Sequence, residues 1–281
     1  MFMLWGVIVV FLSLLCVTVN NVLIWWSIFL LMTLMFITIN KKMNSYSTMI
    51  NYFIMQESLG LMFLLLTYYY FQLMILMMKI GVAPLHFWIF SVTNGINGLN
   101  LMWFLTFQKL PFFFVMMQMM INYMLMFLFV GVFLCMMQML VMKSFKNLMI
   151  LSSTESFNWI LMSWIFLMIN ALFMFIYYLI FMFYLICYYT KNEKIKYLSW
   201  ETVLIFLNLP LTVNFFVKIY ALMSATMNLN LYVLILLFFM FMTVLSLSFW
   251  MINLSVKNVI NNEYSKFVYF VIIPTMMMIV I

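Results

Sequence analysis

Long apolar runs separated by short polar interruptions fill almost the whole chain of 281 residues. Most runs are about 20 residues long, which is the length that an α-helix needs to cross the hydrocarbon core of a bilayer. The pattern predicts an all-α polytopic membrane protein in which residues 1–281 form a single transmembrane domain. The eleven apolar segments span approximately 2–19, 21–39, 49–67, 72–90, 99–118, 122–142, 148–168, 171–190, 199–223, 231–252 and 265–281.

The composition narrows the class of protein further. Hydrophobic residues make up 70% of the chain and charged residues only 6%, whereas soluble domains carry about 25% charged residues. A bilayer accommodates such a surface, because the side chains that face lipid are apolar. The three cysteines (Cys16, Cys135 and Cys187) show no C-x-x-C spacing, so neither a zinc site nor a redox pair is expected. The composition leaves no room for a soluble catalytic domain.

The lysines outside the apolar segments predict an orientation. They follow the second, sixth, eighth and tenth segments, and in a chain of eleven spans these four connections lie on one side of the membrane. The other connections carry no charge, which is the asymmetry that the positive-inside rule describes. The N-terminus is therefore predicted on the positive side and the C-terminus on the other. These lysines are Lys41, Lys42, Lys143, Lys146, Lys191, Lys194, Lys196, Lys257 and Lys266.

Several ionisable side chains remain inside the predicted spans, namely Lys79, Lys109, Lys218, Glu57, Glu155 and His86. A charged side chain at the centre of a span costs ~2.5–3.5 kcal/mol on insertion scales, so such residues usually face the bundle interior and mark ion or proton paths. Lys79 and Lys109 lie in mid-segment, which favours a functional role. Alternatives stay open for the others. Lys218 could snorkel to the interface, Glu155 could be a solvated interfacial carboxylate, and His86 could be a packing histidine.

Prolines interrupt two of the predicted spans, Pro84 the fourth and Pro210 the ninth. Proline removes a backbone hydrogen bond, and in lipid the freed carbonyl groups need partners, so broken helices tend to line cavities. Two broken helices five spans apart predict two inverted five-helix repeats, approximately 2–118 and 122–252, followed by a final helix at 265–281. Paired broken helices in inverted repeats indicate a transport site near the membrane midplane.

Lys79 and His86 lie seven residues apart around the first of these prolines. On an unbroken helix this spacing would place them on one face, about 10 Å apart. Lysine and histidine side chains can both take up and release a proton in a suitable environment. We therefore treat His86, with Glu57, as a candidate partner of the lysines in proton transfer.

Short motifs occur in a fixed order between about residues 51 and 218. The most specific motif is MKIGVAPLHFW from Met78 to Trp88, and the others are YFIMQ from Tyr52, TFQKL from Thr106, Ser152-Ser153 with Trp159, and Leu209-Pro210 with Phe215 and Lys218. Together these motifs resemble those of the NADH-ubiquinone oxidoreductase chain 2 family, whose members are antiporter-like subunits of the membrane arm of mitochondrial complex I. The resemblance implies eleven helices, as in many animals, with the N-terminus on the matrix side.

The resemblance also implies roles for three lysines. Lys79 is similar to the family's central lysine on the first broken helix, Lys109 to the next lysine along the proton path, and Lys218 to the lysine on the second broken helix. The chain departs from the family where a glutamate of the second helix normally pairs with the central lysine, because the aligned stretch 26–30 reads WSIFL. Glu57 or another subunit is expected to supply that partner.

Two further departures concern polar positions. Ser91 stands where the family has a glutamate after the His-Phe-Trp motif, and Ser156, beside Glu155, stands where it has a histidine.

The resemblance implies a core membrane-arm subunit of the proton-pumping NADH:ubiquinone oxidoreductase, translocating protons through a midplane row of lysines. The chain would be an enzyme subunit of the mitochondrial inner membrane without redox chemistry of its own. NADH, FMN, iron–sulfur clusters and ubiquinone are expected in other subunits, and no Gly-rich dinucleotide motif or cysteine cluster is present. Expected partners are other membrane-arm subunits, including a neighbouring antiporter-like chain, and phospholipids, but no nucleic acid. Two alternatives are a stand-alone cation/proton antiporter and a non-pumping structural spacer.

Overall fold

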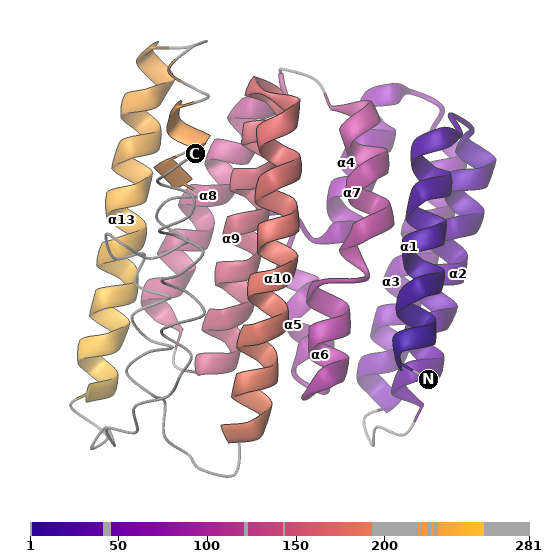
Figure 1. Ribbon diagram of the computed structural model, residues 1–281, viewed down its shortest axis with the longest axis horizontal. Coiled ribbons are helices and arrows are strands. Elements are labelled where there is room, and N and C mark those ends of the chain that lie inside the picture. The colour runs from indigo at the N-terminus through magenta and orange to yellow at the C-terminus, as the bar shows by residue number, and fades with distance from the viewer. Residues whose placement is uncertain are drawn as a thin grey trace. The chain divides into compact units, whose positions relative to one another are not determined.

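A computed structural model describes residues 2–41, 46–120, 123–142, 144–192, 218–219, 221–223, 226 and 230–255. Within these ranges all regular secondary structure is helical (Figure 1). Four segments of the described chain are long and apolar enough to cross a membrane, as judged by length and composition. They are Val22–Asn40, Tyr46–Leu65, Leu99–Met119 and Met124–Val141.

The helices fall into two compact units. The described residues of Met1–Met124 and Leu179–Thr190 form the first unit, and those of Leu125–Tyr178 and Lys191–Ile281 form the second. The first contains α1 (Phe2–Thr18), α2 (Val22–Asn40), α3 (Tyr46–Leu65), α4 (Tyr69–Ile80), α5 (Phe87–Thr93), α6 (Leu99–Leu105) and α7 (Lys109–Met119).

Two helices organise the first unit. Helix α3 packs against α2, α4 and α5, while α7 packs against α1, α2 and α4; α1, α2 and α3 lie side by side in Figure 1. Their core is aromatic: Phe29 stacks on Phe112 with ring centroids 4.5 Å apart, and Phe36 contacts Tyr52 at 4.4 Å. Buried aromatic pairs contribute about 0.5–1.5 kcal/mol beyond the area they bury. This packing joins α2, α3 and α7 around the C-terminal end of α4.

The predicted segment 72–90 is divided between α4 and α5. Helix α4 ends at Gly81, which has φ 76° and leaves no room for a side chain, because a Cβ atom there would lie 2.2 Å from Ile89 Cδ1. The N–H groups of Gly81 and Val82 both donate to the Met77 carbonyl, and the Trp88 indole donates to the Met78 carbonyl over 2.8 Å. These bonds satisfy carbonyl groups that a helix end leaves without intrahelical partners.

The division has a consequence for Lys79 and His86. Residues between Ile80 and Phe87 are not α-helical, so the 10 Å spacing along one unbroken helix does not apply to this pair. Lys79 lies in the last turn of α4, whereas His86 immediately precedes α5.

The predicted segment 99–118 is also interrupted, which the sequence analysis did not anticipate. Helix α6 ends at Leu105 and α7 begins at Lys109, with the Gln108 N–H donating to the carbonyl of Trp103, five residues earlier. Pro111 explains the interruption, because it cannot donate to the Phe107 carbonyl and its ring would clash there in a continuous helix. In the first turn of a new helix such a proline is tolerated.

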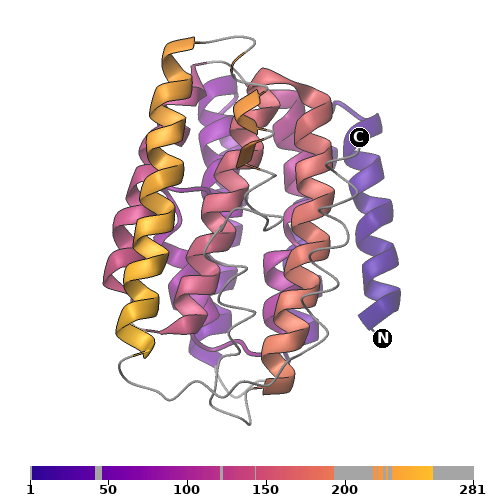
Figure 2. The same cartoon turned by 60° about the vertical axis from the view of Figure 1, so that its left-hand side comes forward.

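The second unit contains α8 (Met124–Val141) except its first residue, α9 (Phe145–Phe166), the first part of α10 (Met168–Asn192) and α13 (Asn230–Ser255). Helix α13 is one continuous helix, coloured orange to yellow in Figure 2. Phe129 of α8 packs on Phe239 of α13 at 6.0 Å, and Phe157 of α9 packs on Phe175 of α10 at 6.2 Å. Aromatic contacts therefore join neighbouring helices here as well.

Two predicted boundaries in the second unit are corrected. Helix α9 begins at Phe145 rather than near 148, because the Ser144 side chain accepts a hydrogen bond from the Asn147 N–H and caps the helix. The break before α10 lies at Leu167, whose backbone is extended (φ −149°, ψ 117°), rather than at Asn170. The break predicted at Pro210 and the predicted segment 265–281 lie outside the described residues.

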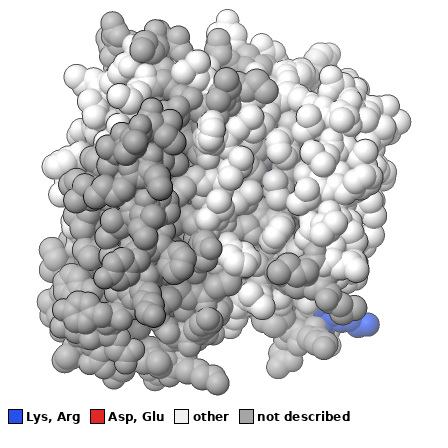
Figure 3. Space-filling view, in the orientation of Figure 1, with Lys and Arg blue, Asp and Glu red and all other residues white. Residues whose placement is uncertain are grey.

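The surface of the described residues is apolar. Many large apolar side chains are exposed, and Val7, Leu65 and Leu234 are among those that are more than two-thirds exposed. Soluble proteins rarely expose large contiguous apolar patches. On the face shown in Figure 3, the described surface is white apart from one small blue patch. Lys41, at the end of α2, is exposed. An apolar surface of this kind matches a surface that faces lipid.

Candidate functional site

Lys79 lies in the last turn of α4 and is only 4% exposed. Its ammonium nitrogen lies 5.0 Å from the centroid of the Phe29 ring and 5.9 Å from that of Phe112. Aromatic faces attract a cation within about 6 Å, so these rings replace part of the lost hydration. Gly60 of α3 makes room for the ammonium, because a Cβ atom at this position would lie 3.3 Å from it.

Among the described residues, Glu57 is the acidic group that acts on Lys79. Its carboxylate, on the same helix as Gly60, attracts the Lys79 ammonium electrostatically. The two groups do not form a salt bridge, since the described residues contain no carboxylate oxygen within 4.0 Å of the Lys79 nitrogen. The hydroxyl group of Thr33 on α2 lies 2.9 Å from Glu57 Oε1 and 2.8 Å from the Leu30 carbonyl, and its hydrogen serves both acceptors. Helix α2 thus orients the Glu57 carboxylate through Thr33, although α2 itself contains no acidic residue.

A small cavity joins Lys79 to Lys109. Lys109, the first residue of α7, is 4% exposed, and the two lysines line the cavity together with the amide side chains of Gln56 and Gln108. The volume is about 10 Å³, close to what one ordered water molecule requires. The rest of the wall consists of Ile80, Trp88, Phe104 and Phe112. The interruptions after α4 and α6 therefore bring both lysines to the wall of one small cavity.

The two glutamines give this cavity polar walls. Gln56 donates to the Lys79 carbonyl oxygen over 3.0 Å, and Gln108 donates to the Tyr52 hydroxyl group. The Oε1 atoms of both amides are buried and accept no hydrogen bond from the described residues. A buried amide oxygen is costly unless it accepts a hydrogen bond, and an ordered water can provide one. The site can thus hold a hydrogen-bonded water between two lysines.

His86 is placed differently. It is fully buried and stacks on Phe87 with ring centroids 5.0 Å apart, with Phe90 at 5.9 Å. It is not part of the cavity wall around Lys79 and Lys109. The structure therefore relates Glu57 to Lys79 by electrostatic attraction and sets His86 in an aromatic environment.

The second unit contains a buried ion pair. The Lys218 ammonium lies 2.6 Å from Glu155 Oε1, and both side chains are buried. The Trp159 indole, one turn along α9, donates to the same carboxylate oxygen over 3.0 Å. Lys218 also donates to the Thr243 hydroxyl group of α13 over 3.5 Å. In the described part of the chain this is the one salt bridge, and Glu155 is enclosed by protein rather than solvated.

Sequence reasoning missed several of these side chains. Gln56 and Gln108 stand directly before Glu57 and Lys109, and a polar amide in an apolar run was the available signal. Glu155 and Lys218 are 63 residues apart in the sequence, so no local sequence pattern predicts that they pair.

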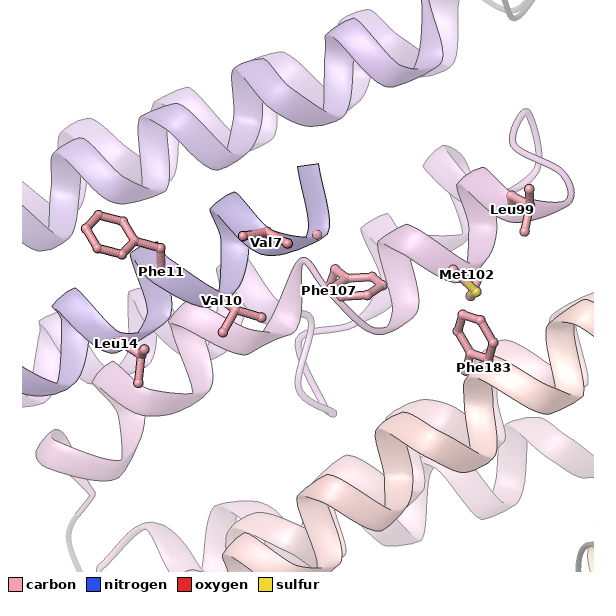
Figure 4. Close-up of a pocket in the computed structure, with 9 residues that line it drawn as sticks. Val7, Val10, Phe11, Leu14, Leu99, Met102, Phe107 and Phe183 are labelled. Carbon is pink, nitrogen blue, oxygen red and sulfur yellow. The ribbon is translucent and has the colours of Figure 1, made fainter. Parts of the chain in front are cut away.

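An apolar groove in the first unit contrasts with these sites (Figure 4). Its volume is about 680 Å³, and it contains no ionisable side chain, so it has no group that could transfer a proton. Phe107, from the interruption between α6 and α7, lies between the side chains of α1 and Met102 in Figure 4. The lining residues are Gly6, Val7, Val10, Phe11, Leu14, Leu99, Met102, Phe107 and Phe183.

Comparison with known proteins identifies two close relatives. A Caenorhabditis elegans protein named NADH-ubiquinone oxidoreductase chain 2 is 49% identical over 274 residues, covering 96% of both chains. An Ascaris suum protein of the same name is 42% identical over 277 residues, covering 98% of this chain and 92% of the relative. No protein-family model matches the chain. The similarity thus extends across both units.

Proposed function

The chain belongs to the NADH-ubiquinone oxidoreductase chain 2 family, and from this premise we propose that it is a core membrane-arm subunit of the proton-pumping NADH:ubiquinone oxidoreductase, respiratory complex I. The apolar surface and the helices of membrane-spanning length support a multi-pass protein of the mitochondrial inner membrane. Other membrane-arm subunits, including a neighbouring antiporter-like chain, and phospholipids would surround it.

Within that complex the chain would translocate protons and carry out no redox chemistry. NADH, FMN, iron–sulfur clusters and ubiquinone would bind elsewhere, because the sequence has neither a Gly-rich dinucleotide motif nor a cysteine cluster. Energy released by electron transfer would reach the chain as changes in charge or conformation at its neighbours.

The cavity between Lys79 and Lys109 is the observation that carries the proposed mechanism. A water molecule held by the Gln56 and Gln108 amides would connect the two ammonium groups. A proton could then pass from one lysine through the water to the other, and a nearby charge would set the direction by favouring one protonation state. Lys218 would serve as the third lysine, in the second unit.

Glu57 is proposed as the charge partner of Lys79 in place of the family's missing glutamate. Its electrostatic attraction on the ammonium and its hydrogen bond with Thr33 support this role. Since the pair is not in direct contact, Glu57 would stabilise the charged lysine without holding it fixed.

The proposed topology has two inverted five-helix repeats, 2–118 and 122–252, with broken helices four and nine. The break between α4 and α5 supports the first of them, and Pro210 suggests the second. With eleven spans, the N-terminus would face the matrix and the C-terminus the intermembrane space, because the flanking lysines gather on one side.

Replacing Lys79 with methionine in the assembled complex tests the mechanism. Methionine keeps most of the apolar side chain and removes the proton carrier, so we expect fewer protons translocated per NADH oxidised. Lys41→Met, which alters an exposed lysine at the end of α2, is the matched control and should pump normally. Full pumping stoichiometry with Lys79→Met would instead favour a structural spacer. That alternative is also supported by the described residues, none of which places a carboxylate oxygen within 4.0 Å of the Lys79 nitrogen.

A second measurement separates a complex I subunit from a stand-alone antiporter. The purified chain in liposomes should exchange no cations for protons by itself. Sustained exchange by the isolated chain would contradict the proposed assignment.

A further inference from the structure

Two opposite charges in the second unit are withdrawn from water together. Lys218 and Glu155 are both buried, and their charged atoms lie 2.6 Å apart. Burying such a pair costs desolvation energy that the mutual attraction does not always offset, and well-packed apolar residues are often as stable or more so. Stability alone is therefore a weak explanation for a buried ion pair in a chain that is otherwise 70% hydrophobic.

The contacts around the pair fix both partners. Glu155 Oε1 accepts from the Trp159 indole as well as from Lys218. The Lys218 ammonium lies 5.7 Å from the centroid of the Trp159 ring and within reach of the Thr243 hydroxyl group, which itself donates to the Met240 carbonyl. Helix α9 thus holds the carboxylate and helix α13 offers the lysine a neutral acceptor.

We propose that Glu155 is the proton-exchanging counterion of Lys218, so that the two side chains act as one proton-holding site in the second unit. This inference rests on the proposed function, in which Lys218 takes part in proton translocation. It assigns to the chain an acidic residue that the family resemblance does not assign, next to Ser156, where the family carries a histidine.

The exchange itself is a single proton transfer. An N–H bond of the Lys218 ammonium breaks and an O–H bond forms on the Glu155 carboxylate, giving a neutral amine and a neutral carboxylic acid. The pair has zero net charge before and after the step, so no uncompensated charge is created in a buried site. A further proton arriving at the amine, or leaving the acid, would then couple the pair to its surroundings.

The two units differ in this respect. Lys79 has aromatic rings and an acidic group beyond 4.0 Å, whereas Lys218 has a carboxylate in direct contact. The Lys218 ammonium is thus held more tightly than that of Lys79. The ion pair opens once Glu155 has taken up a proton and lost its charge.

Glu155→Gln in the assembled complex tests the inference. Glutamine preserves the shape and an acceptor for Trp159 but has no carboxylate to take the proton. We expect the number of protons translocated per NADH oxidised, measured per assembled complex on native gels, to fall as far as in Lys218→Met. Glu155→Asp should retain more pumping than Glu155→Gln because it restores the carboxylate. Ser163→Ala on the same helix, which removes only a bond to the Ile160 carbonyl, is the matched control.

The double variant Glu155→Gln/Lys218→Met should pump no less than either single variant, because the pair acts as a unit. Losses that multiply in the double variant would overturn the inference. So would normal pumping per assembled complex in Glu155→Gln, even if less complex assembles, because the pair would then be structural. Those outcomes leave the proposed function intact as long as Lys218→Met and Lys79→Met pump poorly. Normal pumping in both lysine variants would overturn the proposed function itself.

Discussion

The Lys79 ammonium lies against Gly60 of α3, at a point where even a methyl group would come within 3.3 Å of it. The same methyl group would lie 3.4 Å from the Trp26 indole nitrogen. The missing side chain at Gly60 therefore leaves the space that the Lys79 ammonium occupies.

Gly60→Ala should displace the lysine while leaving α3 helical, because alanine favours a helix by about 1 kcal/mol over glycine. We expect lower proton translocation per NADH oxidised with little change in the amount of assembled complex. Ser58→Ala, at an exposed position of the same helix, is the control and should behave as the unaltered protein. Unchanged pumping in Gly60→Ala would show that the position of the ammonium is not critical.

Thr33→Val should weaken the role of Glu57. Valine matches threonine in shape but removes the hydroxyl group near Glu57 Oε1. A hydrogen bond to a charged group contributes about 1.5–3 kcal/mol, so the carboxylate should be held less firmly and pumping should fall, though less than in Glu57→Gln. The control is Thr38→Val on the same helix, whose hydroxyl bonds only the Met35 carbonyl among the described contacts. Equal pumping in Thr33→Val and Thr38→Val would contradict an active role of Glu57.

Gln56→Leu and Gln108→Leu should each make the cavity between Lys79 and Lys109 less able to hold water. Each change removes an amide oxygen that faces no described donor, and leucine offers no hydrogen bond. We expect a drop in pumping for each variant, measured as protons per NADH oxidised. Gln118→Leu is the comparison, because that glutamine of α7 bonds the carbonyl groups at Cys16 and Val17, away from the cavity. Gln118→Leu should lower the stability of the complex rather than its pumping. A similar loss of pumping in Gln118→Leu would contradict a role of the cavity in proton transfer.

Gly81→Ala should destabilise the junction between α4 and α5. An L-residue in the left-handed conformation costs about 1–2 kcal/mol, and the added Cβ atom would overlap the Ile89 side chain. A lower midpoint of thermal inactivation of the complex is the expected result. Gly6→Ala, where a Cβ atom would meet the Phe107 ring at an ordinary 3.6 Å, should leave the midpoint nearly unchanged. A similar midpoint for both variants would show that the junction tolerates a side chain.

Much of the fold follows from the order of apolar and polar residues. Nine of the eleven predicted segments coincide with described helices, and two of the nine, 72–90 and 99–118, are each split into two helices. The remaining segments, 199–223 and 265–281, lie largely or wholly outside the described residues. Local signals account for this agreement, because the length of a span and the backbone bond that Pro84 cannot make depend on neighbouring residues alone. Pro111 gave the same kind of signal for the interruption before Lys109.

The sequence by itself determined that the chain is helical and apolar, and which few ionisable groups lie within its spans. Only the tertiary structure decided which of them meet: Lys79 shares a cavity with Lys109, and Glu155 pairs with Lys218. The reason is physical. In a soluble helix the polar face shows which side points outward, but here lipid-facing and core-facing side chains are both apolar. The rotation of each helix is therefore set by packing between helices, and so are the partners of its charges.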